Sequence, residues 1–217
     1  MYGTILSGMT SAMHALGVIS NNVANSSSTA FQKSDTTFAD MFSSGTPESS
    51  AGNAPGLGSV IEGTRRSQKQ GNLIERDGVL NLGLSGSGFF VVARPDGAGG
   101  AGNNLAFTRV GEFSLDAEGY IRSNDGSYLL GTLGDGGLAS DLSGLNALKI
   151  PPKEGEQSLT GLTVGGDGMV VANYGSDLMS NIGQINIATF PNSMGLRNVS
   201  QSRFESTADS GRAVLGI

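Results

Sequence analysis

The chain carries no charged side chain before Lys33, and this feature constrains its fold most strongly. The opening segment, MYGTILSGMTSAMHALGVISNNVANSSSTAFQ, contains no Asp, Glu, Lys or Arg, and its only titratable side chains are Tyr2 and His14. A helix that faces water normally carries charges on its wet side. We therefore expect this segment to pack against protein, either as the core helix of a globular domain or as a helix buried among copies of itself.

Apolar residues in the opening segment recur at helical spacing. Leu6 and Met13 are seven residues apart, and Met9, Leu16 and Val23 repeat the same step. Together they give the alternating three-and-four pattern of a narrow helical seam. The remaining positions are mostly small and uncharged, so neighbouring helices are expected to approach from several sides. We predict that these five residues, called the seam below, form an assembly interface.

A polar run should end this helix. Its members are Asn21, Asn22, Asn25 and Ser26–Thr29. Short polar side chains bond to nearby backbone groups and so compete with helical hydrogen bonds. We therefore assign residues 1–33 to a helical assembly arm, and we expect residues 1–30 to be exposed, frayed or loosely packed in the isolated chain.

Residues 34–58 are predicted to be a short helix followed by a connector. Phe38, Met41 and Phe42 would share one face of that helix. Residues 43–58 are rich in Ser, Gly, Ala and Pro, a composition typical of linkers. This segment is expected to join the arm to the rest of the chain.

From residue 59 onward the sequence is typical of antiparallel β-structure, and we assign residues 59–217 to a β-rich outer domain that stands independently. The 35 glycines and the 15% of charged residues fit strands joined by tight turns. Residues 89–92 (FFVV) are apolar on both faces of a predicted strand. Residues 79–84 alternate, which places the leucines of this segment on one face. Those leucines are Leu80, Leu82 and Leu84.

Turn signals divide the rest of this domain into short strands. Asp116–Gly119 and Asn124–Gly126 predict the turns of a meander over residues 107–130. Gly166–Gly168 predicts the turn of a later hairpin. Residues 131–160 are expected to be an irregular insertion. The predicted fold class is therefore mainly β, an antiparallel β-rich domain preceded by an extended α-helical arm that forms coiled coils.

Residues that could perform chemistry are scarce. His14, the only histidine, lies on the predicted apolar helix, where a packed or interfacial role is favoured over that of a catalytic base. Residues 97–102 match the GxGxxG pattern of dinucleotide-binding loops, but a strand rather than the required helix is predicted to follow. Asp and Asn before Gly are explained by turns without a calcium ion. We expect no catalytic, cofactor-binding or metal-binding residues and no enzyme activity.

Charge and hydropathy restrict the partners and the location of the chain. The net charge of −6 disfavours nucleic acid, whose phosphates would be repelled. The N-terminus lacks a cationic region followed by a continuous apolar core, so it is not an ordinary cleavable secretory signal. No apolar run approaches the length of a membrane span, so we expect no direct membrane insertion.

The segment that ends the predicted arm resembles the N-terminal signature of the bacterial flagellar rod and hook axial proteins. That signature is an Asn-Asn-hydrophobe-Ala-Asn run, a Ser/Thr-rich break and then Gly-Phe-Lys. The matching residues here are Asn21, Asn22, Asn25, Phe31 and Lys33. Ala30 replaces the usual Gly, and Gln32 intervenes before the Lys. If that Gly normally takes a positive φ, Ala30 brings the geometry of the turn into question.

Further segments are similar to the same family and occur in its order. They are Gly71–Leu73, Gly86–Phe90, residues 107–120 and residues 183–196. The resemblance implies a structural subunit that is exported unfolded by the flagellar type III apparatus, without a cleaved signal. It also implies helical self-assembly with neighbouring rod or hook subunits into the axial tube that transmits motor torque for motility. The expected location is the flagellar basal body or hook, periplasmic to extracellular.

Two details bear on which member of the family the chain resembles. Family members normally continue into a Leu/Glu-rich C-terminal helix that pairs with the arm. Either the natural chain extends beyond Ile217 or this member dispenses with that helix, and we favour the first interpretation. Hook proteins usually carry a large outer domain where this chain has residues 131–160, which suits a distal-rod-type subunit or a minimal hook. Residues 37–42 and 171–174 look like the hook protein.

The alternative to a flagellar subunit is a free-standing β-rich binding or adhesive module. The chain has no Trp and only 4 Tyr, so it supplies few side chains that could stack on sugars.

Overall fold

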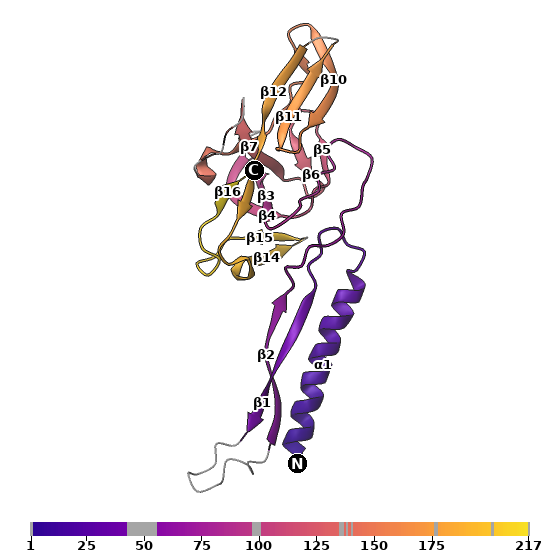
Figure 1. Cartoon of the computed structure of the whole chain (residues 1–217), viewed down its shortest axis with the longest axis vertical. Helices are drawn as coiled ribbons and strands as arrows, with labels where there is room; N and C mark the ends of the chain where they lie inside the picture. Colours follow the sequence, from indigo (N-terminus) through magenta and orange to yellow (C-terminus); the bar gives the residue numbers. More distant parts are fainter. Residues whose placement is uncertain are drawn as a thin grey trace. The chain divides into compact units, whose positions relative to one another are not determined.

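The computed structural model describes residues 2–42, 56–96, 101–134, 137, 139, 141–175, 178–200 and 202–216. The chain divides into two compact units, Met1–Lys69 (unit 1) and Gln70–Ile217 (unit 2). Within the described residues, unit 1 holds the single α-helix and the rest of the regular structure is mostly antiparallel strand (Figure 1). This confirms the predicted fold class.

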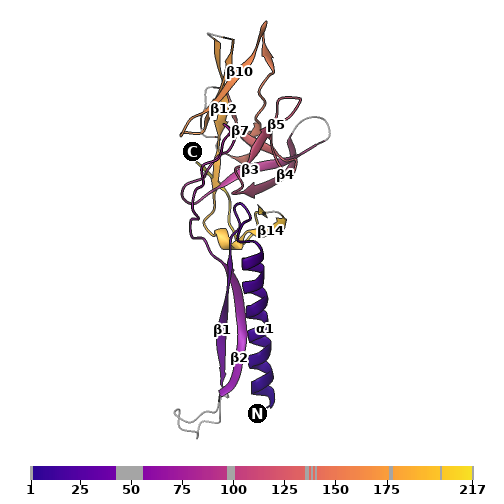
Figure 2. The same cartoon turned by 90° about the vertical axis from the view of Figure 1, so that its right-hand side faces the viewer.

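Unit 1 is a long helix beside a two-stranded hairpin. The helix α1 spans Tyr2–Ala24, and strands β1 and β2 span Ser34–Phe42 and Gly56–Arg66. The strands pair antiparallel, from Ser34 opposite Arg66 to Phe42 opposite Gly56, with two register shifts. Figures 1 and 2 both show α1 running alongside this hairpin. An isolated hairpin is at best marginally stable in water, so α1 contributes to holding β1 and β2 together.

The predicted short helix over residues 34–42 is wrong, because this segment is the strand β1. β-branched and aromatic residues such as Thr36, Thr37 and Phe38 favour a strand once a partner strand is present. That partner, β2, begins at Gly56, inside the predicted connector, and belongs to unit 1 rather than to the outer domain. The remainder of the predicted connector, residues 43–55, lies outside the described residues.

The helix α1 continues through the first residues of the polar run before it ends. Asn21 and Asn22 are still helical, and α1 ends at Ala24. The Asn25 backbone N–H donates to the Asn21 carbonyl at 3.1 Å, and its side-chain Nδ2 donates to the same oxygen at 3.0 Å. The helix is continuous from Tyr2, so the expected fraying is not observed.

Unit 2 is built around a large antiparallel sheet. The strand order along its main path is β14-β15-β4-β3-β7-β12-β11-β10-β9, and β5, β6, β8, β13 and β16 attach to it off this path. The strands are β3 (Phe89–Pro95), β4 (Ala101–Thr108), β5 (Phe113–Leu115), β6 (Ile121–Ser123), β7 (Tyr128–Leu133), β8 (Asn146–Ala147), β9 (Lys153–Glu154), β10 (Gln157–Val164), β11 (Met169–Tyr174), β12 (Leu178–Ile185), β13 (Ile187–Thr189), β14 (Arg197–Ser200), β15 (Arg203–Glu205) and β16 (Val214–Gly216). Two short 3-10 helices, Leu142–Gly144 and Ser193–Gly195, complete the described elements.

Strand β3 is buried on both faces, as predicted. Phe90 and Val92 join one apolar cluster, and Phe89, Val91 and Ala93 join a second. Successive side chains of a strand point to opposite faces, so one strand serves two cores. The first cluster also contains Ile121, Leu129, Ile150, Val170 and Tyr174, and the second contains Phe107, Leu130, Leu196 and Phe204.

The leucines of residues 79–84 share one face, as predicted, but this segment does not form the predicted strand. Leu80, Leu82 and Leu84 all pack against the first cluster, although they belong to no named strand. The Leu82 N–H donates to the Gly111 carbonyl at 2.8 Å, and a Cβ on Gly111 would lie 1.7 Å from the Leu82 carbonyl oxygen. This close approach needs a glycine at residue 111.

The predicted meander and later hairpin are confirmed as β5-β6-β7 and β10-β11. Asp116 Oδ1 accepts the N–H groups of Glu118 and Tyr120 at 3.1 and 2.7 Å, and Gly119 takes a φ of +89° in the same turn. The predicted irregular insertion is shorter than residues 131–160, because β7 continues to Leu133 and β10 begins at Gln157.

Candidate assembly surface

One side of α1 is covered by the hairpin of the same unit. The covered positions are Ser7, Gly8, Ser11, Ala15, Val18 and Asn22. Ser11, 5% exposed, is the one buried residue of this helix, and its Oγ donates to the Ser59 carbonyl at 3.2 Å. A Cβ on Gly58 would lie 2.1 Å from Ser7 Oγ. Small side chains on α1 and a glycine on β2 therefore permit close packing of helix and strand.

Asn22 fastens the C-terminal part of α1 to the start of β1. Its Oδ1 accepts the Ser34 backbone N–H at 2.9 Å, and its Nδ2 donates to the Ser34 carbonyl at 2.7 Å. A carboxamide that bonds both backbone groups of one residue satisfies them as a neighbouring strand would. Asn22, a residue of the family-like motif, thus has a structural role within unit 1.

The remaining motif residues build the connection from α1 to β1. The Phe31 N–H donates to the Ser28 carbonyl at 3.3 Å, and the Lys33 carbonyl accepts the Ser67 N–H at 2.8 Å, next to the first pair of the hairpin. Ala30 takes a φ of 57°. It therefore adopts the left-handed conformation that a glycine would take without strain.

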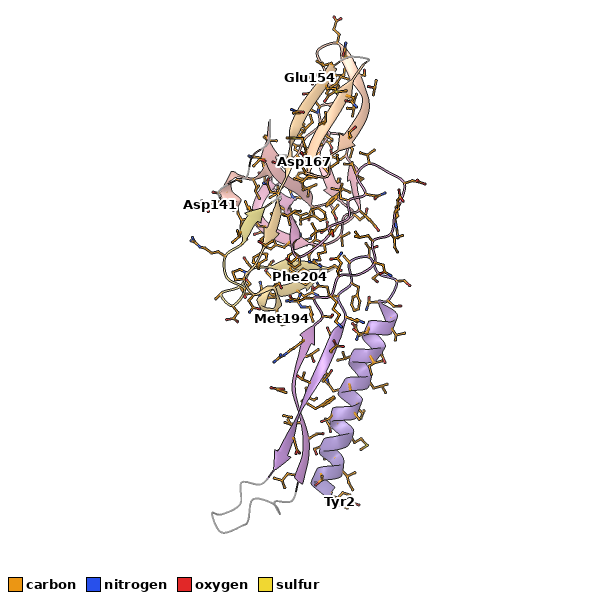
Figure 3. The ribbon with its side chains drawn as sticks, in the orientation of Figure 1. Tyr2, Asp141, Glu154, Asp167, Met194 and Phe204 are labelled. Carbon is orange, nitrogen blue, oxygen red and sulfur yellow. The ribbon has the colours of Figure 1, made fainter. Side chains whose placement is uncertain are left out.

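The seam lies on the opposite side of α1. Leu6, Met9, Met13, Leu16 and Val23 are 60%, 55%, 68%, 63% and 67% exposed, which confirms the expected exposure of the arm. With 3.6 residues per turn, the seam is roughly half a turn from Ser11 and Asn22. Tyr2, labelled in Figure 3 at the first turn of α1, is also almost fully exposed. The expectation that small residues leave several sides of the helix open is therefore wrong for one side, which the hairpin occupies.

His14 lies beside a hollow rather than on the seam. This hollow, about 320 Å³, is lined by His14, Gly17, Val18, Asn21, Ser34 and Thr64. No carboxylate lines it, so the described residues provide His14 with no acidic partner for a triad-like arrangement. Among the described residues there is also no group of three or more His, Cys, Asp or Glu side chains placed to hold a metal ion.

The exposed side of α1 is apolar and uncharged. No residue of α1 carries a charge, so its exposed apolar side is not interrupted by ionic groups. Contiguous exposed apolar surface on a folded chain marks an interaction site. In the described part of the chain, no helix has the length and apolarity needed to cross a bilayer.

Arg109 joins two of the family-like segments of unit 2, Gly86–Phe90 and residues 107–120. Its Nε donates to the Gly88 carbonyl at 3.0 Å and its Nη2 donates to the Gly86 carbonyl at 2.8 Å. The guanidinium also lies 5.3 Å from the ring centroid of Phe89. Burial lowers the pKa of Arg109 from its ordinary value. Two segments that are separate in the sequence thus form one structural element.

The covered side of α1 was missed by sequence reasoning. Its residues recur at the same three-and-four spacing as the seam, but all of them except Val18 are small or polar. A second stripe of small residues on a charge-free helix was the available signal for close packing against another element.

Comparisons with known proteins cover both units. Residues 83–172 match a family model described as flagellar hook protein FlgE/F/G D1 domain. The chain is 30% identical over 210 residues to the flagellar basal-body rod protein FlgG of Buchnera aphidicola subsp. Schizaphis graminum, which covers 92% of this chain and 71% of that protein. It is 30% identical over 223 residues to the rod protein FlgG of Bacillus subtilis, covering 96% and 74%. The flagellar hook protein FlgE of Caulobacter vibrioides is 33% identical over 131 residues, covering 60% of this chain and 22% of that protein.

Proposed function

Because the chain belongs to the bacterial flagellar rod and hook axial protein family, we propose that it assembles helically with copies of itself and transmits motor torque. Members of this family are structural subunits of the flagellar basal body or hook, and that is the role and location of this chain. Its proposed partners are neighbouring rod and hook subunits and the type III export apparatus.

The observation that carries this proposal is the exposed seam on a helix whose other side is already covered. Each large apolar side chain gains about 1.5–3 kcal/mol when it moves from water into a packed interface. The seam presents five such side chains, and the rest of unit 1 offers them no partner among the described residues. Association with the arms of other subunits is the arrangement that would bury them.

Torque transmission is supported by the way the arm is braced. Ser11 bonds β2 near the middle of α1, and Asn22 bonds β1 near its end. A helix fixed to a hairpin at two points resists twisting better than a free helix.

We place the assembly arm within unit 1, with residues 1–33 making the contacts between subunits. We place the β-rich outer domain in unit 2.

A rod position is favoured over a hook position. The similar rod proteins match 92% and 96% of this chain, whereas the similar hook protein matches 60% of it and has most of its own length outside the match. We therefore propose that the chain is a distal-rod-type subunit.

The test is a charge placed in the seam. In cells that produce the protein only as Met13→Glu, we expect completed rods in electron micrographs of basal bodies and swimming to be lost, because a buried unpaired charge is costly. Met179→Glu, the same change at a methionine of unit 2 that is 75% exposed and outside the seam, is the matched control and should retain both. Normal rods with Met13→Glu would overturn the proposal. Normal motility without the protein, together with specific glycan binding, would instead support a free-standing binding module.

A further inference from the structure

Two of the seam residues are methionines that lie side by side. Met9 and Met13 are four residues apart, so they are neighbours on the surface of α1, and they are 55% and 68% exposed. We propose that Met9 and Met13 form an oxidation site that controls assembly: conversion to methionine sulfoxide in the unassembled subunit blocks association. This inference rests on the proposed assembly through the seam.

The modification needs only a two-electron oxidant such as hydrogen peroxide. A lone pair of the thioether sulfur attacks one peroxide oxygen, an S–O bond forms and the O–O bond breaks. The departing hydroxide takes up the proton of the new S–OH group and leaves as water. The sulfur is oxidised by two electrons and the peroxide is reduced by two, giving a polar sulfoxide in place of a flexible apolar thioether.

The seam residues next to these methionines offer a sulfoxide no hydrogen-bond donor. The adjacent seam residues Leu6 and Leu16 have no donor groups, and no Lys or Arg precedes Lys33. The nearby Thr10 hydroxyl already donates to the Leu6 carbonyl at 2.9 Å. When the interface is made of copies of this arm, it would place a strong acceptor among apolar side chains, which opposes association.

The state of the subunit decides whether the site reacts. Both methionines are open to solvent in the single chain, and assembly through the seam would cover them. Oxidation therefore acts before incorporation, and incorporated subunits are protected. Met179 and Met194, 75% and 50% exposed, lie in unit 2 outside the seam and provide an internal comparison (Figure 3 labels Met194).

The experiment treats the purified full chain with hydrogen peroxide, maps oxidised methionines by peptide mass spectrometry and measures assemblies by sedimentation. When Met9 and Met13 are both oxidised, we expect the sedimenting fraction to fall at least about tenfold, the effect of one buried unsatisfied acceptor. In Met9→Leu/Met13→Leu, peroxide should leave the sedimenting fraction at the value that this variant has without peroxide. Met179→Leu/Met194→Leu, the matched control, should stay sensitive. Methionine sulfoxide reductase should restore assembly of the oxidised chain.

The rate of methionine oxidation in assemblies made from the unoxidised chain gives a readout that needs no variant. Peroxide should oxidise Met9 and Met13 at least about tenfold more slowly in assemblies than in the single chain. Full assembly of the doubly oxidised chain, or peroxide sensitivity of Met9→Leu/Met13→Leu, would overturn this inference and leave the proposed function standing. Equal oxidation in both states would show that assembly leaves the seam exposed, and would overturn both this inference and the proposed association through the seam. Failure of the untreated chain to assemble would instead overturn the proposed function.

Discussion

The two units use their apolar residues in opposite ways. Among the described residues, every buried hydrophobic side chain lies in unit 2, whereas the buried residue of unit 1 is the polar Ser11. Unit 1 has four basic and four acidic residues, and unit 2 has nine and fifteen, so the net charge of −6 belongs to unit 2. The buried apolar side chains are thus gathered in unit 2, whereas unit 1 leaves its seam exposed.

The described part of unit 1 has no buried apolar side chain, and its internal contacts explain how it holds together. Neutral hydrogen bonds from Ser11 and Asn22 and the close approach at Gly58 join α1 to the hairpin. Small and polar contacts fix the orientation of the helix while its large apolar side chains stay exposed. The difference between the units teaches that exposure of the seam results from how unit 1 is packed.

The sharpest way to break this comparison is to truncate one leucine in each unit. Leu129→Ala should lower the free energy of unfolding of unit 2 by about 3 kcal/mol, because Leu129 is fully buried in the first apolar cluster. Leu16→Ala, on the exposed seam, should change it by less than about 0.5 kcal/mol. Urea unfolding followed by circular dichroism measures both. A large effect of Leu16→Ala in the unassembled chain would mean that the seam is part of an internal core.

The buried ion pair of unit 2 gives the next largest effect. Asp125 and Arg203 pair with side chains 11% and 10% exposed. Burial opposes the charge of Asp125, but hydrogen bonds from Ser127 and the Arg203 charge and hydrogen bond together lower the pKa of Asp125 below its ordinary value. Asp125→Asn should cost about 3 kcal/mol at neutral pH, because Arg203 is left buried without its counter-charge. Asp141→Asn, at an exposed position, is the control.

The pH dependence of this pair follows from the sign of the shift. Because the pKa of Asp125 is lowered on folding, its contribution is complete above the ordinary Asp value and declines as pH falls below about 4. The stability difference between the wild type and Asp125→Asn should therefore shrink in acid. A difference that grows below that pH would contradict the assignment.

A smaller effect is expected where α1 meets β2. Gly58 has a φ of +110°, and a Cβ added there would clash with Ser7 Oγ. Gly58→Ala should therefore destabilise the packing of unit 1 by about 2 kcal/mol. Amide hydrogen exchange in α1, β1 and β2 should speed up, while exchange in unit 2 stays unchanged. Gly63→Ala is the matched control, because its φ is ordinary and no atom lies within 4 Å of its Cβ. Equal effects of the two changes would show that α1 is not held at Gly58.

The sequence predicted the parts of each unit whose signal is local. The double-sided strand at Phe89–Val92, the turns at Gly119 and Gly126, and the exposed seam all follow from patterns within a few residues. The strand β1 was mistaken for a helix because its conformation depends on β2, across the residues between Phe42 and Gly56. The covered side of α1 was missed for a similar reason, since Ser11 and Asn22 gain their roles only from a partner that is distant in sequence.

The smallest expected effect concerns the turn between α1 and β1. Ala30 and Ser202 are the described non-glycine residues with a positive φ, at 57° and 59°, one in each unit. Ala30→Gly should stabilise unit 1 by about 0.5–1 kcal/mol, because relief of the left-handed strain exceeds the added entropy of the unfolded chain. Ser202→Gly, as the counterpart in unit 2, should act on that unit alone. Amide hydrogen exchange measures the effects on the two units separately. Slower exchange in α1 and β1 is the expected result for Ala30→Gly. Faster exchange there would show that Ala30 stabilises the turn through contacts that outweigh its backbone strain.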